Sequence, residues 1–383
     1  MNAESFLLQA KRKSGVTNID STQVYEALSR LIDALHNEAK LSQFGRMIAS
    51  KDIERMLQNY FETQAFHQSF KDSSSNAKIK KPVFIIGMPR TGSSFLHNLL
   101  ACDSRWRAPK YWETLYSSPP TKSESPSRHR IRKAKVDLAL FHMIAPNYRK
   151  IYMYGAELAA ECIAIMAMSF VSPRFGFTYN VPSYWNWISK NQCFEGYRFH
   201  KTFLEFLQLP EDKTQWLLKA PGHIMHLGSL LNFYPDCRLI FTHRHPLKAI
   251  PSIASNTQTL RKVFSKHSQA EEVGKEELER WSLAWDHTEK IRQSPALDPS
   301  QWIDLNYSEI VADPLEIAKK IYKAFKMEFT KETENSMKTF LEKNTQNKHG
   351  KHVYMHESFG LKESDIETKF SSYIEKFNLK QEA

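Results

Sequence analysis

The sequence predicts an α/β fold of three layers, in which helices flank a central parallel sheet. Four short apolar runs have the length and composition of buried parallel strands, at 83–86, 216–218, 239–241 and 302–305. Apolar residues at helical spacing separate these runs, around 227–233, 253–264, 278–291 and 317–325. Strands that alternate with helices in this way favour a parallel sheet covered on both faces.

Other segments divide the chain around this core. Residues 1–78 are predicted to form an N-terminal helical region packed on the core, with a polar, Ser-rich linker at its end. The α/β domain is predicted at 79–345, with a helical, aromatic-rich insert at about 128–212 on the acceptor side. Within the insert, Glu157 and Glu161 interrupt the most apolar stretch of the chain, 151–171. Because they are four residues apart, we expect them on one face of a helix that is buried against protein rather than lipid.

The overall composition indicates an ordinary globular protein. The 383 residues include 53 Lys and Arg against 42 Asp and Glu, a net charge of +11 that favours anionic partners but also serves solubility. The four cysteines are scattered without metal-ligand spacing, and no signal peptide is evident, so we expect reduced thiols in a cytoplasmic protein. We expect no transmembrane segment and no metal site.

The first predicted strand runs into a loop suited to binding phosphate. The loop reads Gly87-Met-Pro-Arg90-Thr91-Gly92-Ser93-Ser94 and opens a helix, whose first N–H groups have no partners within the helix. Gly92 allows close approach of the backbone, the two serines add hydroxyl donors, and Arg90 adds a forked cation. The spacing is that of a P-loop, but Ser93 replaces the lysine that contacts the β- and γ-phosphates of ATP or GTP.

This stretch resembles the 5′-phosphosulfate loop of sulfotransferases that use 3′-phosphoadenosine-5′-phosphosulfate (PAPS). It is most similar to the bacterial branch that carries PRTG[ST][ST]. The resemblance implies a P-loop-like fold, with PAPS as co-substrate bound by Arg90, Thr91, Gly92, Ser93 and Ser94. It covers roughly residues 81–361 and implies in-line transfer of a sulfonate group to a hydroxyl or amine.

A second anion site is predicted beyond the strand at 239–241. Arg244 follows that strand and Ser252 comes eight residues later, near the start of a helix. In the family, an Arg and a Ser at this spacing hold the 3′-phosphate. The resemblance also places Tyr307 near the adenine, although a core tyrosine explains this residue as well. It implies further that the basic segment 346–383 closes over the nucleotide through Lys348, His349 and Gly350.

Two residues compete for the role of general base. Glu113 follows the helix of the phosphate loop, where related enzymes carry a catalytic glutamate, and we prefer it. His223 follows Lys219 by four residues, where the cytosolic branch has its histidine two residues after the lysine. The resemblance implies that Lys219 supports the leaving group and that Arg90 stabilises the sulfonate. Because the donor is already activated, we expect no metal requirement.

Other functions remain open at this stage. A lysine-less P-loop phosphotransferase or nucleotide-binding protein is the alternative enzyme class, but it lacks both the lysine and an evident magnesium carboxylate. A nucleic-acid-binding protein would need a concentrated basic stripe, whereas the cations here are spread along the chain, so no nucleic acid is expected. The acceptor is expected to be a small molecule, lipid or carbohydrate, and its identity is left open. The N-terminal helices either cover the acceptor or mediate formation of a homodimer.

Overall fold

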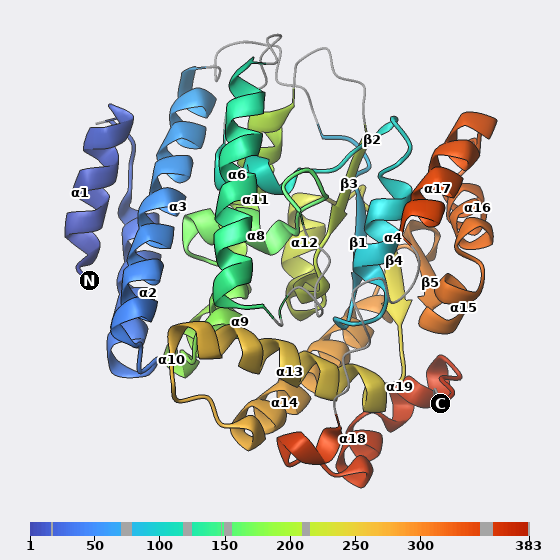
Figure 1. Ribbon diagram of the computed structural model, residues 1–383. Helices are drawn as coiled ribbons and strands as arrows, with labels where there is room; N and C mark the ends of the chain where they lie inside the picture. Colours follow the sequence, from blue (N-terminus) through green and yellow to red (C-terminus); the bar gives the residue numbers. More distant parts are fainter. Residues whose placement is uncertain are drawn as a thin grey trace.

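Five parallel strands form the central sheet of the computed structural model (Figure 1). The structure describes residues 1–16, 18–69, 79–117, 125–146, 148, 155–208, 215–344 and 355–381. In sheet order the strands are β2 (Trp106–Arg107), β3 (Gln215–Lys219), β1 (Val83–Gly87), β4 (Arg238–His243) and β5 (Trp302–Asn306). The predicted three-layer α/β fold is therefore confirmed.

The central strand β1 shows why these residues form a buried sheet. It pairs with β3 on one side and with β4 on the other, and all five of its residues are buried. Val83 and Ile85 point to one face, while Phe84 and Ile86 point to the other, as the two-residue repeat of a strand requires. The four predicted strands are all present. Strand β2 was not predicted, because its two residues are too few to form an apolar run.

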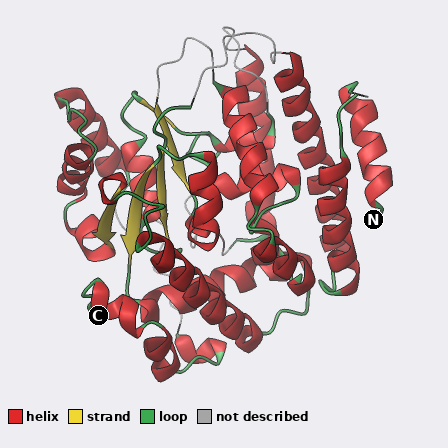
Figure 2. Cartoon of the chain, turned by 180° about the vertical axis from the view of Figure 1, so that it is seen from behind, coloured by secondary structure: helices red, strands yellow, loops and turns green. Residues whose placement is uncertain are grey.

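Helices cover both faces of the sheet (Figures 1 and 2). On the Val83 face they are α4 (Ser93–Leu100), α15 (Tyr307–Ala312), α16 (Pro314–Ala324) and α17 (Lys331–Lys343). The larger layer on the Phe84 face includes α8 (Cys162–Met166), α9 (Arg174–Thr178), α10 (Pro182–Lys190), α11 (Phe194–Leu207), α12 (Leu227–Phe233), α13 (Pro246–Phe264) and α14 (Ala270–Arg292). Short 3-10 turns lie at Ala167–Ser169, Pro221–His226, Pro299–Gln301 and His356–Phe359.

The N-terminal helices share the core of the larger layer. They are α1 (Ala3–Ser14), α2 (Thr22–Asn37) and α3 (Gln43–Ser69). Their apolar residues belong to the same hydrophobic cluster as Phe84 and Phe241 of the sheet. Aromatic residues of the insert, including Phe170, Phe175, Tyr179 and Tyr184, are also buried in this cluster. These side chains therefore build the core rather than an acceptor surface.

The stretch around Glu157 and Glu161 corrects one prediction. Residues 155–161 do not form a helix, because Ala159 pairs with Lys110 and the Ala160 N–H donates to the Pro109 carbonyl. Helix α8 begins only at Cys162. The two glutamates therefore do not share a helical face. Glu157 is exposed and forms an ion pair with Lys135, whereas Glu161 is largely buried.

The remaining helices lie at the periphery. They are α5 (Tyr111–Leu115), α6 (Ser125–Ile144), α18 (Glu363–Lys369) and α19 (Ser371–Lys376). Tyr373 of α19 packs on Trp285 and hydrogen-bonds to His243 at the end of β4. Among the described helices, none is both long and apolar enough to cross a bilayer.

Candidate active site

The loop between β1 and α4 has the backbone shape that an anion site requires. Arg90 has φ 69° and Gly92 has φ 83°, both in the left-handed region. A Cβ on Gly87, whose φ is 136°, would lie 2.4 Å from the carbonyl oxygen of Thr242, so the loop can leave β1 in this way only with glycine there. The Thr91 hydroxyl stabilises this loop by hydrogen bonds to the Met88 carbonyl at 2.8 Å and to the Thr242 hydroxyl at 2.6 Å.

The first turn of α4 faces the carboxyl edge of the sheet. Gly92 occupies the N-cap position without a side-chain cap, and Ser93 and Ser94 are the first helical residues. The N–H groups at this helix start have no partners within the helix, and the helix dipole adds partial positive charge. The Ser94 hydroxyl accepts a hydrogen bond from Lys219 Nζ at 2.9 Å. The loop and the end of β3 therefore meet at one point.

The two predicted anion sites are joined by direct contacts. Arg90 Nε donates to Ser252 Oγ on α13 at 3.1 Å. Arg244, one residue beyond β4, donates from Nη1 to the Arg90 carbonyl oxygen at 2.9 Å. Its guanidinium lies 4.0 Å from the ring centroid of Tyr307, the first residue of α15. Residues from β1, β4 and β5 thus converge at the switch point of the sheet, where ligands of α/β proteins bind.

Lys219 ends β3 and is almost completely buried. Its side chain is 2% exposed and forms an ion pair with Glu161, which is 13% exposed. Glu161 occupies the N-cap position of α8. Sequence reasoning missed Glu161 as a site residue, because the only signal was a charge within an apolar stretch. The pairing of Ala159 with Lys110 leaves Glu161 beside Lys219 at the end of β3.

Glu113 is held by hydrogen bonds at the start of α5. Both carboxylate oxygens accept hydrogen bonds from Arg107, at 2.5 and 3.0 Å, and Oε2 also accepts from the Lys110 N–H at 2.6 Å. Glu113 is the third residue of α5, and its hydrogen bond to the Lys110 N–H is that of the N3 glutamate of a capping box. Both oxygens of this carboxylate accept hydrogen bonds that stabilise the start of α5. The geometry therefore does not favour Glu113 as a base.

His223 lies in the core. Its ring packs edge-on against Phe84, with the centroids 5.2 Å apart, and Nδ1 pairs with the Tyr197 hydroxyl at 2.8 Å. Burial, and then the neighbouring His200 and His226, lower the pKa of His223 well below its ordinary value. A buried, weakly basic imidazole is a poor proton acceptor. The geometry therefore favours neither of the two bases predicted from the sequence.

The third predicted nucleotide element lies outside the described residues. Lys348, His349 and Gly350 belong to the part of the chain of which nothing is described. Across the described ranges, no group of three His, Cys, Asp or Glu side chains is arranged to hold a metal ion.

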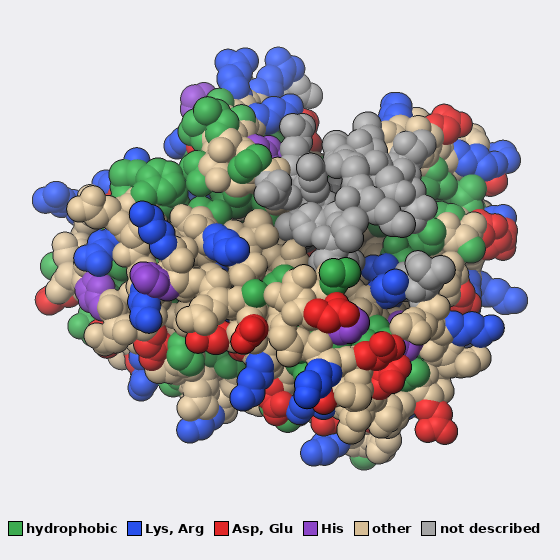
Figure 3. Space-filling view, turned by 60° about the horizontal axis from the view of Figure 1, so that its bottom comes forward, with side chains coloured by type: hydrophobic (Ala, Val, Ile, Leu, Met, Phe, Trp, Pro, Cys, Tyr) green, Lys and Arg blue, Asp and Glu red, His purple; other side chains and the backbone are tan. Residues whose placement is uncertain are grey.

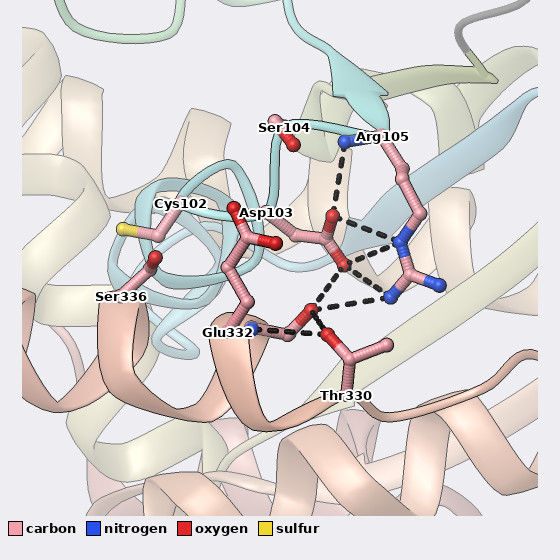
Figure 4. Close-up of a pocket in the computed structure, with 8 residues that line it drawn as sticks. Cys102, Asp103, Ser104, Arg105, Thr330, Glu332 and Ser336 are labelled. Carbon is pink, nitrogen blue, oxygen red and sulfur yellow. Dashed lines mark hydrogen bonds and ion pairs between the residues drawn. The ribbon is translucent and has the colours of Figure 1, made fainter.

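A small pocket lies at the opposite end of α4 (Figure 4). Asp103 forms its floor and accepts hydrogen bonds from Arg105, Tyr322 and Thr333. Burial alone would raise the pKa of Asp103, but these hydrogen bonds outweigh burial and lower the pKa to about 2. The network ties β2 to α16 and α17, so it holds this edge of the fold together.

Comparison with known proteins agrees with the geometry of the site. Residues 82–331, well over half of the chain, match the model of a family described as "Sulfotransferase family". Two curated relatives are the omega-hydroxy-beta-dihydromenaquinone-9 sulfotransferases Stf3 of Mycobacterium bovis and Mycobacterium tuberculosis. Each is 24% identical over 255 residues, which cover 63% of this chain and 61% of the relative. The match thus spans about three fifths of each relative's length.

Two solved structures share the fold over nearly their whole length. The sulfotransferase STF1 of Mycobacterium tuberculosis H37Rv has a TM-score of 0.84 and 25% identity, with 97% of this chain and 99% of that chain covered. The sulfotransferase STF9 of Mycobacterium avium has a TM-score of 0.86 and 23% identity, with 100% and 98% covered. With the family model matching from just before β1 to the start of α17, this chain belongs to the sulfotransferase family.

Proposed function

We propose that the protein is a PAPS-dependent sulfotransferase that transfers a sulfonate group to a hydroxyl or amine of an acceptor. The observation that carries this proposal is the contact between its two anion-binding elements. Arg90 in the phosphate loop donates to Ser252, and Arg244 donates back to the Arg90 carbonyl. PAPS has a phosphosulfate at its 5′ end and a phosphate at its 3′ end, so two neighbouring anion sites suit it better than a triphosphate.

The cations at the site would each contact a different part of PAPS. Arg244 and Ser252 would hold the 3′-phosphate, and the loop from Arg90 to Ser94 would hold the 5′-phosphosulfate. Lys219, already within hydrogen-bond distance of Ser94, would neutralise the charge that develops on the leaving phosphate oxygen. Tyr307, whose ring packs against Arg244, would be the candidate for contact with the adenine base.

The acceptor we propose is a hydroxyl on an apolar molecule. The curated relatives are named for a hydroxylated menaquinone, which is a lipid with a terminal alcohol. Their match covers only part of their length, so a screen is the direct test. Labelled PAPS would be offered to a panel of long-chain alcohols, phenols, amines and sugars, with label transfer as the readout.

Ligand-induced stabilisation tests the donor independently of the acceptor. We expect adenosine 3′,5′-bisphosphate to raise the melting temperature more than ATP or duplex DNA does. Arg244→Ala should weaken that binding about 10- to 100-fold, since hydrogen bonds to charged groups contribute about 1.5–3 kcal/mol. Arg238→Ala, at the opposite end of β4, is the matched control. Stronger stabilisation by ATP would instead favour a phosphotransferase.

A further inference from the structure

Glu161 is the carboxylate that the fold brings to the proposed reaction centre. Its side chain forms an ion pair with Lys219, and Lys219 donates to Ser94 at the start of α4. The helix α8 begins one residue later, so the backbone of Glu161 is fixed by a helix start. Three elements, namely the phosphate-loop helix, the end of β3 and the N-terminus of α8, therefore meet at this residue.

Tyr148 lies in the neighbourhood of this carboxylate. Burial, then Glu161 and Tyr111, raise the pKa of Tyr148, while Arg90 acts in the opposite direction. Glu161 and Arg90 are thus both close enough to Tyr148 to influence its ionisation. The carboxylate therefore contacts Lys219 and has Tyr148 in its neighbourhood.

Two carboxylates close in sequence to this region, Glu113 and Glu157, have different roles. Both oxygens of Glu113 are engaged by Arg107 and by the start of α5. Glu157 is 59% exposed and pairs with Lys135 on the surface. Glu161 is the carboxylate of the three that contacts a proposed catalytic residue.

We propose that Glu161 is the general base of the transfer, an inference that rests on the proposed function. Glu161 accepts the proton of the acceptor hydroxyl as its oxygen bonds to sulfur. The bond between sulfur and the bridging oxygen of PAPS breaks, and that oxygen leaves on adenosine 3′,5′-bisphosphate with Lys219 beside it. The products are the sulfate ester, the bisphosphate and protonated Glu161, which returns its proton to water.

The test compares Glu161→Gln with Glu157→Gln and the wild type. Label transfer from PAPS to the acceptor panel and binding of adenosine 3′,5′-bisphosphate are measured on each full-length protein. We expect Glu161→Gln to bind the bisphosphate as the wild type does and to lose about 10²–10⁴-fold in turnover. Glu157→Gln should remain fully active.

The outcomes separate this inference from the proposed function. An active wild type with an active Glu161→Gln variant overturns the role of Glu161 alone. A variant that has lost bisphosphate binding to the same extent as turnover also overturns it, because the residue would then serve binding. A wild type that binds no bisphosphate and transfers no label overturns the proposed function itself.

A second inference comes from the outward face of α6. Val136, Leu140 and Met143 are 54%, 53% and 78% exposed, and they lie within about one third of the helix circumference. The same helix carries the cations Arg128, Arg130, Arg132 and Lys133 towards its start, against one acidic residue, Asp137, while Lys135 pairs with Glu157. Figure 3 shows hydrophobic side chains beside Lys and Arg side chains on the protrusion at its upper edge, where α6 lies.

The position of α6 links this face to the proposed site. Phe141 of α6 packs edge-on against Tyr148, with the ring centroids 5.5 Å apart. Burial, and then the charge of Glu161, raise the pKa of Tyr148. The apolar end of α6 is therefore the part of the helix that adjoins Tyr148.

We infer that this face of α6 docks on an anionic lipid surface. Apolar side chains of an interfacial helix enter the boundary of the acyl chains, while Lys and Arg pair with anionic headgroups. The charge of α6 complements such a surface, whereas a second copy of this chain would bring the same cations face to face. Docked in this way, the protein would receive an apolar acceptor directly from the membrane.

Flotation with lipid vesicles tests the docking. We expect the full-length protein to bind vesicles that contain phosphatidylglycerol and not vesicles of phosphatidylcholine alone. Arg132→Glu should weaken binding by about five-fold or more, since each cation near the surface contributes about 1 kcal/mol. Leu140→Ser with Met143→Ser should weaken it about ten-fold. Leu283→Ser, at an exposed leucine of α14, is the control.

Two results would overturn the docking. One is vesicle binding that is absent or unchanged in these variants. The other is a dimer in sedimentation experiments that Leu140→Ser dissociates, because the face would then be an interface between copies of the chain.

Discussion

Four buried histidines should make the protein sensitive to mild acid. Burial lowers the pKa of His97, His200 and His226 to about 3 each, and lowers that of His223 well below its ordinary value. None of their side chains is more than 2% exposed. His226 has no hydrogen-bond partner at either ring nitrogen, and each of the other three has one nitrogen without a partner. The folded state therefore holds all four rings neutral.

The lowered pKa values determine the direction and the size of the change in stability with pH. Because the folded pKa lies below the unfolded value of about 6.5, the unfolded chain binds more protons as the pH falls. Stability is thus fully present above about pH 6.5 and is lost between there and about pH 3. Each histidine should cost about 1.3 kcal/mol between pH 7 and pH 5.5, or about 5 kcal/mol for four. Such a loss is a large part of the stability of a typical domain.

Urea unfolding at pH 7 and pH 5.5 measures this loss. The range stays above the pH at which ordinary carboxylates titrate, so histidines dominate the change. His226→Leu should remove about 1.3 kcal/mol of the pH dependence, and His267→Gln at an exposed histidine should leave it unchanged. A change of less than about 1 kcal/mol in the wild type between the two pH values would refute the reasoning.

Three further predictions concern the site and its surroundings. Glu113→Gln should lower the free energy of unfolding by about 2–3 kcal/mol, because it weakens the pair with Arg107 and the start of α5. Turnover should be kept. Loss of turnover without loss of stability would restore Glu113 as the base. Gly92→Ala should weaken bisphosphate binding at least ten-fold, since φ is 83° and the new Cβ would lie 3.1 Å from the Tyr307 ring; calorimetry checks this. Activity should persist in EDTA, and loss that Mg²⁺ restores would contradict a metal-free mechanism.

Much of the fold could be predicted because its signals are local. Strands β1, β3, β4 and β5 are short, continuous apolar runs, which is how strands buried on both faces appear in a sequence. The two-residue β2 carries no such signal. Glu161 was placed in a helix because its neighbours are apolar, whereas the pairing of Ala159 with Lys110 keeps that backbone extended. Pairing between distant segments cannot be inferred from apolar spacing.

The difference between local signals and contacts between distant segments also explains which site residues could be predicted. Arg90, Lys219 and Arg244 could be grouped from the sequence because each follows a parallel strand, and the carboxyl ends of such strands share one edge. The place of Glu113 at the start of α5 could not be inferred from the sequence, since the N-cap position holds Lys110 instead of the usual Ser or Thr. His223 follows a strand too, but it turns into the core instead of the edge.

The buried pair of Lys219 and Glu161 is poorly explained by stability alone. Moving two charges out of water costs several kcal/mol for each, and apolar replacements of such pairs are often neutral or stabilising. Lys219 nonetheless ends β3 at 2% exposure, beside the helix start that would bind the phosphosulfate. A cation at this point suits a leaving phosphate, and a carboxylate beside it suits an acceptor that loses a proton. Each charge offsets the burial of the other, and we infer that the reaction uses both.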